Sequence, residues 1–217
     1  MEARELYRFF HTSTEETIAL RGISVRIERG EMVAVVGPSG CGKSTLLHCL
    51  CGLDVPDGGH VSVDGIRLSR RSETERGALR SRFIGVLLQS GNLFEHLDIG
   101  ENIRAAQSLG PRVARVGPAA VLDAVGLRDK LRARPSTLSG GEAARASLAV
   151  ALANDPAILL ADEPTGEVDA VTEGTIVELL LERTVEGRAV VVVTHSERVA
   201  RSAHRVIRIS DGRIVDA

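Results

Sequence analysis

Apolar side chains recur along the chain in two patterns, and both are typical of β-strands. Residues 23–28 alternate between apolar and polar side chains, as a strand buried on one face does. Residues 31–36, 158–162 and 189–194 are almost continuously apolar, which is typical of parallel strands buried on both faces. The sequence therefore predicts a buried parallel sheet, with further strands in the first third of the chain.

Shorter strands are predicted near both ends of the chain. Residues 60–64 and 83–89 have strand patterns in the first half. Residues 205–209 and 213–215 flank Ser210-Asp211-Gly212, which is typical of the turn in a closing hairpin. We therefore expect the chain to end on two antiparallel strands.

The middle of the chain, from about residue 90 to 154, has no buried-strand pattern. It is rich in Ala, Leu and Arg, and Gly126 and Pro135 interrupt it, so we expect a small lobe of helices. Further helices are expected at residues 43–51 and 171–182, between predicted strands. The architecture that follows is a buried parallel sheet interrupted by a helical insertion.

Residues 37–45 match the phosphate-loop pattern G-x-x-x-x-G-K-[ST], directly after a predicted strand and at the start of a predicted helix. Glycines let backbone N–H groups turn inward around a phosphate, and the helix N-terminus adds its positive dipole. We expect Lys43 to neutralise the β- and γ-phosphates and the Ser44 hydroxyl to ligate Mg²⁺. The residues expected to bind the nucleotide here are Gly37, Pro38, Ser39, Gly40, Cys41, Gly42, Lys43, Ser44 and Thr45.

Two acidic side chains, Asp162 and Glu163, end the buried strand at residues 158–162. A carboxylate at such a position costs free energy unless a cation meets it. We expect Asp162 to hold Mg²⁺ through water and Glu163 to polarise an attacking water as a general base. A solvated turn is the alternative interpretation, and the phosphate loop in the same chain disfavours it.

Residues 138–142 read Leu-Ser-Gly-Gly-Glu, directly before a predicted helix. Ser139 suits the N-cap, and Glu142 three residues later completes a capping box. Gly141 is not needed for a cap, but it would let a ligand approach the backbone closely. A second helix N-terminus with free N–H groups is a second phosphate site. One chain with two phosphate sites and one nucleotide predicts a head-to-tail dimer, in which each subunit closes the partner's phosphate loop.

Composition narrows the classes of function. The net charge of −2 disfavours a protein that coats nucleic-acid phosphates, and 2% aromatic residues leave few side chains that could stack on bases, so we expect no nucleic-acid partner. Only two lysines, Lys43 and Lys130, stand against 25 arginines, so a lysine at the phosphate-loop position is improbable by chance.

The cysteines and the apolar runs indicate a cytoplasmic protein. Cys41, Cys49 and Cys51 lack the C-x-x-C spacing of a zinc or redox site, so we expect reduced, partly buried thiols. No apolar run approaches the ~20 residues that span a bilayer. The first residues carry acidic side chains where a signal peptide has an apolar core. We expect the chain to remain in the cytosol unless a partner holds it elsewhere.

Over essentially its whole length, the sequence resembles the ATP-binding subunits of ATP-binding cassette (ABC) transporters. The motifs that carry the resemblance follow in the family's order: the phosphate loop at 37–45, Gln89 as the Q-loop glutamine, the signature at 138–142, Walker B at 158–163 and His195 as the switch histidine. The resemblance implies an α/β fold with a P-loop NTPase core, a mainly parallel sheet, an antiparallel β subdomain near the N-terminus and an inserted α-helical subdomain.

The same resemblance divides the chain and gives roles to its residues. It implies one ABC ATPase domain, 1–217, with the core and β subdomain in 1–89 and 155–217 and the helical signature subdomain in about 90–154. It implies that Gln89 joins the Mg²⁺ shell and senses the membrane partner, and that His195 holds the γ-phosphate and water. The catalytic residues would be Glu163, His195 and Lys43; the nucleotide would also contact Phe10, Gln89, Ser139, Gly140, Gly141 and Glu142; Mg²⁺ would contact Ser44, Gln89 and Asp162.

Finer details resemble one branch of the family, which serves lipoprotein release, macrolide and peptide export, and FtsE-type cell-division complexes. These details lie at residues 19–24, 45–47, 162–166 and 194–195. The resemblance implies that Ser139 and Gly141 contact the γ-phosphate held by the partner subunit, and that an aromatic side chain stacks on adenine. Phe10 fits this position best, with Tyr7 and Phe9 as alternatives.

Two segments depart from the family pattern. The D-loop reads Gly166-Glu167-Val168-Asp169, where Asn or Ala usually precedes Leu-Asp, and Ala143-Ala144 replace the usual glutamines after the signature. Neither change removes a catalytic group.

The function implied is that of an ATP-binding and ATP-hydrolysing subunit, a homodimer around two ATP molecules with Mg²⁺. It would lie on the cytoplasmic face of the membrane and drive a separately encoded transmembrane permease, in an export or mechanotransmission complex. A soluble ABC ATPase acting on DNA or ribosomes is one alternative, although 217 residues leave no room for its usual insertions. A regulatory ATPase of a cell-division complex, without solute transport, is another.

Overall fold

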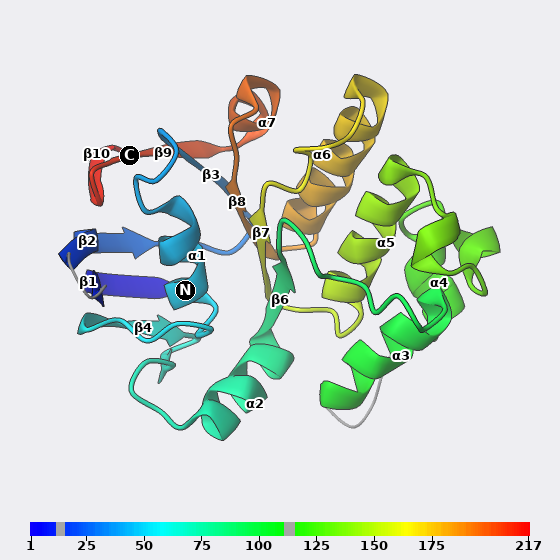
Figure 1. Ribbon diagram of the computed structural model, residues 1–217, viewed down its shortest axis with the longest axis horizontal. Helices are drawn as coiled ribbons and strands as arrows, with labels where there is room; N and C mark the ends of the chain where they lie inside the picture. Colours follow the sequence, from blue (N-terminus) through cyan, green and yellow to red (C-terminus); the bar gives the residue numbers. More distant parts are fainter. Residues whose placement is uncertain (12–15, 111–115) are drawn as a thin grey trace.

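Two β-sheets and a lobe of helices make up the computed structural model, which describes residues 1–11, 16–110 and 116–217 (Figure 1). In Figure 1 the smaller sheet lies on the left and the lobe of helices α3, α4 and α5 on the right, with strands β6, β7 and β8 between them. This arrangement is the α/β class expected from the sequence. The subdomain limits at 89/90 and 154/155 stay a prediction.

The larger sheet has the strand order β10-β9-β3-β8-β7-β6 and is parallel from β9 to β6. β10 pairs antiparallel with β9, which confirms the predicted closing hairpin. β7 and β8 are buried along their whole length, as their unbroken apolar runs predict. The strands are β3 (Met32–Val36), β6 (Ile84–Leu87), β7 (Ile158–Asp162), β8 (Ala189–Val193), β9 (Arg205–Ser210) and β10 (Arg213–Asp216).

The smaller sheet is antiparallel and has the order β2-β1-β4-β5. Its first strand is absent from the sequence predictions, because shifts of register at Ala3/Leu6, Leu6/Tyr7 and Arg8/Phe9 break the two-residue alternation that would have revealed it. The strands are β1 (Glu2–His11), β2 (Glu16–Arg26), β4 (Gly58–Val63) and β5 (Ile66–Arg67).

Helix α1 (Lys43–Leu50) lies between the two sheets, and its Leu46, Leu47 and Leu50 share one apolar core with side chains of both. The opposite face of the larger sheet packs against α6 (Ala170–Val185) and α5 (Gly140–Leu152). Both faces of the central strands are therefore covered, as a parallel sheet requires.

The lobe of helices has its own core, built from α3 (Ile99–Leu109), α4 (Pro118–Asp123) and α5. Two short 3-10 helices, η1 (Arg128–Lys130) and η2 (Pro135–Thr137), lead from α4 to α5. Within the described residues no helix has the length and apolar character needed to cross a membrane.

Two further helices, α2 (Glu73–Phe83) and α7 (Glu197–Ser202), are absent from the sequence predictions. α2 buries no side chain and therefore has no apolar period, although Ser72 and Glu75 form a complete capping box at its start. α7 has only six residues. The positions of both helices are determined by their capping residues and their neighbours and not by an apolar stripe.

All three cysteines are free and buried, whereas the sequence predicted partly buried thiols. Burial raises the pKa of Cys49 to about 12 and that of Cys51 to about 11. Both groups therefore stay protonated at neutral pH and act as small apolar side chains in the core around α1.

A buried asparagine joins the lobe of helices to the segment that leads into it. Asn102 on α3 is 2% exposed. Its Oδ1 accepts from the N–H of Phe94 at 2.7 Å, and its Nδ2 donates to the carbonyl oxygens of Phe94, Leu97 and Asp98. Both Nδ2 hydrogens and one lone pair of Oδ1 are bonded inside the protein, so Asn102 ties residues 94–98 to α3.

Replacement of Asn102 by Ala is expected to lower the free energy of unfolding by about 2–3 kcal/mol, because it leaves several buried backbone groups unpaired. Chemical denaturation followed by circular dichroism measures the loss. Ser108→Ala on the same helix removes only an exposed bond to Ala105 and is expected to change stability by less than about 0.5 kcal/mol. Equal unfolding midpoints for the two variants would contradict the role given to Asn102.

Candidate functional site

A cavity of ≈ 880 Å³ opens where the carboxyl ends of β6, β7 and β8 meet the start of α1 and the side of α5. A crevice beyond the carboxyl ends of parallel strands is the usual ligand site of such sheets. Many of the residues singled out by the sequence line it together: Ser39, Gly40, Lys43, Ser44, Gln89, Gly140, Asp162, Glu163 and His195. These residues come from both halves of the core and from the lobe of helices.

The phosphate loop is held between two strands from opposite ends of the chain. A Cβ atom on Gly37 would lie 2.1 Å from the carbonyl oxygen of Ile209 in β9, and one on Gly42 would lie 2.4 Å from that of Ala19 in β2. Both glycines also have positive φ, 156° and 106°. The loop is fastened further by the N–H of Gly212, which donates to the carbonyl oxygen of Cys41 at 3.0 Å. Glycine is therefore needed here for packing as well as for access to a phosphate.

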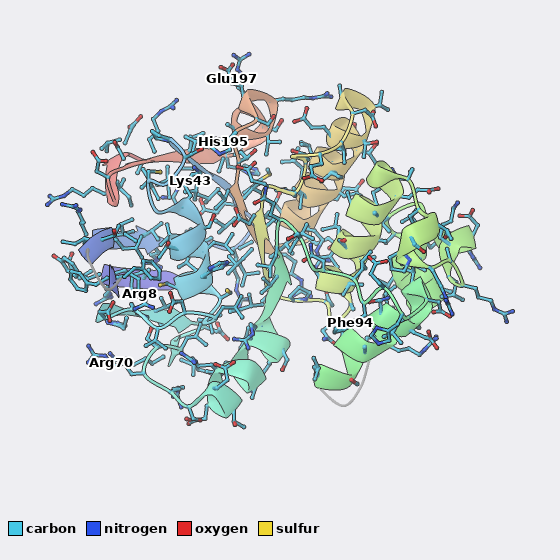
Figure 2. All side chains as sticks on the ribbon, in the orientation of Figure 1. Arg8, Lys43, Arg70, Phe94, His195 and Glu197 are labelled. Carbon is cyan, nitrogen blue, oxygen red and sulfur yellow. The ribbon has the colours of Figure 1, made fainter. Side chains whose placement is uncertain are left out.

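Lys43 points back over this loop at the start of α1. Its side chain is largely buried, and its Nζ donates to the carbonyl oxygens of Gly37 and Pro38 at 2.9 Å each. An ammonium has three donors, so one remains for a ligand. In Figure 2, Lys43 and His195 project from neighbouring elements, and both line the cavity.

Asp162 and Glu163 sit where β7 ends, next to the end of β8. The N–H of Glu163 continues the ladder by donating to Val193 at 2.9 Å, and Glu163 itself has a positive φ of 47°, which is rare for a residue with a side chain. Its Oε2 accepts from the N–H of His195 at 3.2 Å, and its Oε1 lies 3.3 Å from the His195 Nε2. Glu163 and His195 are thus close enough to act on one reacting group.

The geometry of this pair leaves one carboxylate oxygen free. Glu163 Oε1 is buried, yet it accepts no hydrogen bond from the residues that the structure describes, since the His195 contact has ion-pair distance without hydrogen-bond geometry. A buried acceptor without a donor costs free energy. Glu163 also lines the cavity, so its carboxylate is suited to receive a proton from a bound molecule.

Gln89 follows β6 in a short loop that lines the cavity. Asn92 closes the loop: its Oδ1 accepts from the N–H of Leu88 at 2.8 Å and its Nδ2 donates to the carbonyl oxygen of Leu88 at 2.6 Å. Gly91 lies between Gln89 and Asn92 and has a φ of 76°. Asn92 is a positioning residue that the sequence analysis missed, although its place three residues after Gln89 in a Gly-containing turn was a usable signal.

The signature segment forms the capping box predicted from its sequence. Ser139 Oγ accepts from the N–H of Glu142 at 3.3 Å, and Glu142 Oε2 accepts from the N–H of Ser139 at 2.9 Å. Lys130 Nζ lies 2.9 Å from the other carboxylate oxygen of Glu142. The Ser139 N–H and the Lys130 ammonium hold the pKa of Glu142 at about 2, so this carboxylate is ionised at all physiological pH values.

Gly141 has a packing role that the sequence did not reveal. A Cβ atom here would lie 2.7 Å from Thr172 Oγ1 in the first turn of α6. Thr172 is fixed in turn by Asp169, which accepts from its hydroxyl at 2.7 Å and caps α6. These contacts lower the pKa of Asp169. The signature helix and the segment after Walker B therefore touch within one chain.

The same first turn of α6 also holds the segment around His195. Glu173 Oε1 accepts from the Ser196 hydroxyl at 2.5 Å, and Arg198 donates to the carbonyl oxygen of Ala170 at 2.7 Å. Ser196 caps α7 directly after His195. One helical turn thus contacts both the signature and the histidine loop. The sequence could not indicate this, because the contacts join residues more than 20 positions apart.

Other predicted residues are not part of the lining of this cavity. These are Gly37, Pro38, Cys41, Gly42, Thr45, Ser139, Gly141, Glu142 and Phe10. Phe10 lies in β1 and is 41% exposed, with the Arg8 guanidinium over its ring at 4.7 Å. Tyr7 packs against Gly22 and Gly58. Tyr7 is 38% exposed, close to the value for Phe10, so the choice among Phe10, Tyr7 and Phe9 as the stacking residue stays a prediction.

Known proteins match this chain over its whole length. The family model described as ABC transporter matches residues 20–166. The lipoprotein-releasing system ATP-binding protein LolD 2 of Rhodopirellula baltica is 39% identical over 226 residues, which cover 100% of this chain and 89% of that protein. The macrolide export ATP-binding/permease protein MacB of Bordetella avium is 41% identical over 220 residues, which cover 99% of this chain but 33% of that protein.

A solved structure is similar in fold over the same length. The dimeric, post-hydrolysis state of the ATP-binding cassette MJ0796, bound to ADP and Pi, superposes with a TM-score of 0.92 at 34% identity. The match covers 99% of this chain and 96% of that one.

Gly141→Ala is expected to lower the free energy of unfolding by about 1–3 kcal/mol, because the new methyl group overlaps the Thr172 hydroxyl. In a Thr172→Ala background the same change is expected to cost less than about 1 kcal/mol, since the two sites share one contact. Gly140→Ala is the matched control, because its Cβ would meet only the Glu167 carbonyl at 3.8 Å. Denaturant unfolding measures all four variants. Equal costs in both backgrounds would exclude the contact as the cause.

Proposed function

The chain belongs to the ABC transporter family as an ATP-binding subunit with ATPase activity, and on this premise we propose that it works as a head-to-tail homodimer that drives a separate transmembrane permease. Hydrolysis takes place in the cavity beside the phosphate loop. The observation that carries the proposal is the meeting of Lys43, Asp162, Glu163 and His195 in this one cavity.

The donors around the cavity fit Mg²⁺. Ser44, Gln89 and Asp162 offer hydroxyl, amide and carboxylate oxygens, which are the ligands that this hard cation prefers. Asp162 is 6% exposed, and within the described ranges its carboxylate has no hydrogen-bond or ion-pair partner in the protein. A buried carboxylate needs a cation nearby. When bound, the ion would neutralise charge on the phosphate oxygens.

Glu163 acts as general base in this proposal. Its buried Oε1 has a free lone pair at the cavity, and its Oε2 is held by the His195 N–H. Because Glu163 lines the cavity, a proton leaving an attacking water can pass to its carboxylate. Lys43 neutralises the β- and γ-phosphates, and His195 contacts the γ-phosphate from the end of β8.

The partner subunit completes the site through the start of its α5. In the capping box the Ser139 hydroxyl accepts from Glu142, so its own hydrogen remains free to donate. Among the described residues, none accepts from the N–H groups of Gly140 and Gly141. Three donors at a helix N-terminus can hold a γ-phosphate. The dimeric state of the cassette MJ0796 supports this arrangement.

The names of the similar proteins support an export or mechanotransmission role. They describe a lipoprotein-releasing system and a macrolide export protein, the latter an ATP-binding/permease protein. We propose that this chain lies on the cytoplasmic face of the membrane and binds a permease of that branch. A regulatory role in a cell-division complex would use the same ATPase cycle without moving a solute.

Glu163→Gln keeps the size and hydrogen bonding of the side chain but removes its ability to accept a proton. ATP hydrolysis is expected to fall by at least about 10²-fold, the usual loss with a general base, while Mg·ATP binding persists. The loss of a carboxylate near the γ-phosphate should also stabilise an ATP-loaded dimer. Phosphate release and light scattering measure the two effects. Lys43→Ala is the control, because it should fail at nucleotide binding itself. Parental phosphate release by Glu163→Gln would exclude Glu163 as the base.

Affinity purification from detergent-extracted membranes tests the partner. We expect a membrane protein with four helices and a large extracytoplasmic domain to copurify with the chain. When this membrane protein is removed, the chain should keep its ATPase activity. A six-helix bundle would contradict the export and division branch. Copurifying ribosomes or DNA, with no membrane protein, would favour the soluble alternative.

A further inference from the structure

Lys130 is not on the lining of the cavity, yet it is one of only two lysines in the chain and pairs with the signature residue Glu142. Its Nζ lies 2.9 Å from Glu142 Oε1, and the side chains of Lys130 and Glu142 are 31% and 23% exposed. Lys43, the other lysine, is committed to the phosphate loop. Lys130 is therefore a second functional candidate of the same rare residue type.

The backbone that carries Lys130 is firmly held. Its N–H donates to the carbonyl oxygen of Leu127 at 2.9 Å, and its own carbonyl accepts from Ala133 at 3.0 Å. The N–H of Gly100, in the first turn of α3, donates to the carbonyl oxygen of Leu131 at 2.9 Å. Leu127 is 2% exposed in the core of the lobe. The Lys130 ammonium thus reaches Glu142 from a backbone whose position is fixed.

This contact fixes both oxygens of the Glu142 carboxylate. Oε1 faces Lys130 and Oε2 accepts from the N–H of Ser139. The N–H of Glu142 in turn bonds Ser139 Oγ, which directs the one hydroxyl hydrogen of Ser139 away from the helix. The Glu142 carboxylate holds the N–H of Ser139, so if this side chain were to swing out, the N-cap backbone would lose its acceptor and Ser139 would be held less firmly.

Charge gives Lys130 a second effect at the same place. Glu142 lies in the first turn of α5, where the partner's triphosphate would arrive, and its negative charge opposes that approach. Lys130 neutralises this charge at contact distance. The fold itself gains little from the pair, because partly exposed ion pairs contribute little to stability.

We propose that Lys130 is a positioning residue of the composite ATP site, which acts through Glu142 to orient the signature toward the nucleotide of the partner subunit. This inference rests on the proposed head-to-tail dimer. It assigns a function in ATP-dependent dimerisation to a residue that lies outside the signature and does not touch the nucleotide of its own subunit.

The test measures ATP-dependent dimerisation of Lys130→Met by sedimentation velocity with Mg·ATP, in the Glu163→Gln background. Dimerisation is expected to weaken by about tenfold, because each dimer loses the contact at both of its sites. Nucleotide binding by the monomer and the melting temperature should stay unchanged. Lys130→Arg, which keeps the charge, should recover most of the loss. Arg128→Met is the matched control, because Arg128 is a neighbouring exposed cation that pairs only with Asp123 in the described structure.

A double-mutant cycle separates action through Glu142 from a direct action of the charge. Glu142→Gln keeps the capping acceptor, so Lys130→Met is expected to have less than a twofold effect in that background. An undiminished loss there, or no loss in the parental background, would overturn the proposal. The same comparison can be made in variants that retain Glu163. There, the protein concentration that gives half-maximal ATPase activity reports the strength of dimerisation.

Ser139→Arg distinguishes failure of this inference from failure of the proposed dimer. A bulky cation at the N-cap should block dimerisation while nucleotide binding by the monomer persists. If Ser139→Arg blocks dimerisation and Lys130→Met does not, only the role of Lys130 is wrong. If neither variant affects ATP-dependent dimerisation, the composite site itself is wrong.

Discussion

Burial of β3, β7 and β8 on both faces is the constraint on which the rest of the molecule depends. A strand covered on both sides by helices has no place for a charge along its length, because an unpaired charge in such surroundings costs several kcal/mol. Polar groups can therefore gather only where these strands end. Lys43 follows β3, Asp162 and Glu163 end β7, and His195 follows β8. Parallel strands bring these ends to one edge, so the fold assembles the site from three distant parts of the chain.

Sequence reasoning succeeded where burial or backbone chemistry leaves a local signature. β7 was predicted at its observed bounds because its apolar run is unbroken, and the capping box at Ser139 was predicted from residues three positions apart. It failed where structure depends on distant neighbours. β1 was missed because bulges disrupt its alternation. The contacts of Lys130 and Thr172 with the signature were missed because only the folded chain brings these residues near it.

The first turn of α6 contacts two parts of the site, the signature and the segment after His195, which the motifs alone do not indicate. Thr172 packs on Gly141, and Glu173 binds Ser196, next to His195. Neither contact involves a residue that the motifs name as catalytic. The residues predicted to act on the subunit's own nucleotide and those proposed to face the partner's nucleotide therefore share one support. Packed contacts of this kind shift between discrete arrangements and do not deform gradually.

The contacts that hold the phosphate loop affect when the loop can fold during synthesis of the chain. The loop near the N-terminus is closed by Ile209 in β9 and by the Gly212 N–H in the final hairpin. Chains emerge from the ribosome N-terminus first, and contacts between distant segments form late because their loop-closure entropy must be overcome. A nascent chain therefore carries the complete phosphate-loop sequence long before it can hold that loop in place. Every motif of the site lies before β9, so a chain that stops short of residue 205 would carry all of them without the contacts that fasten the phosphate loop.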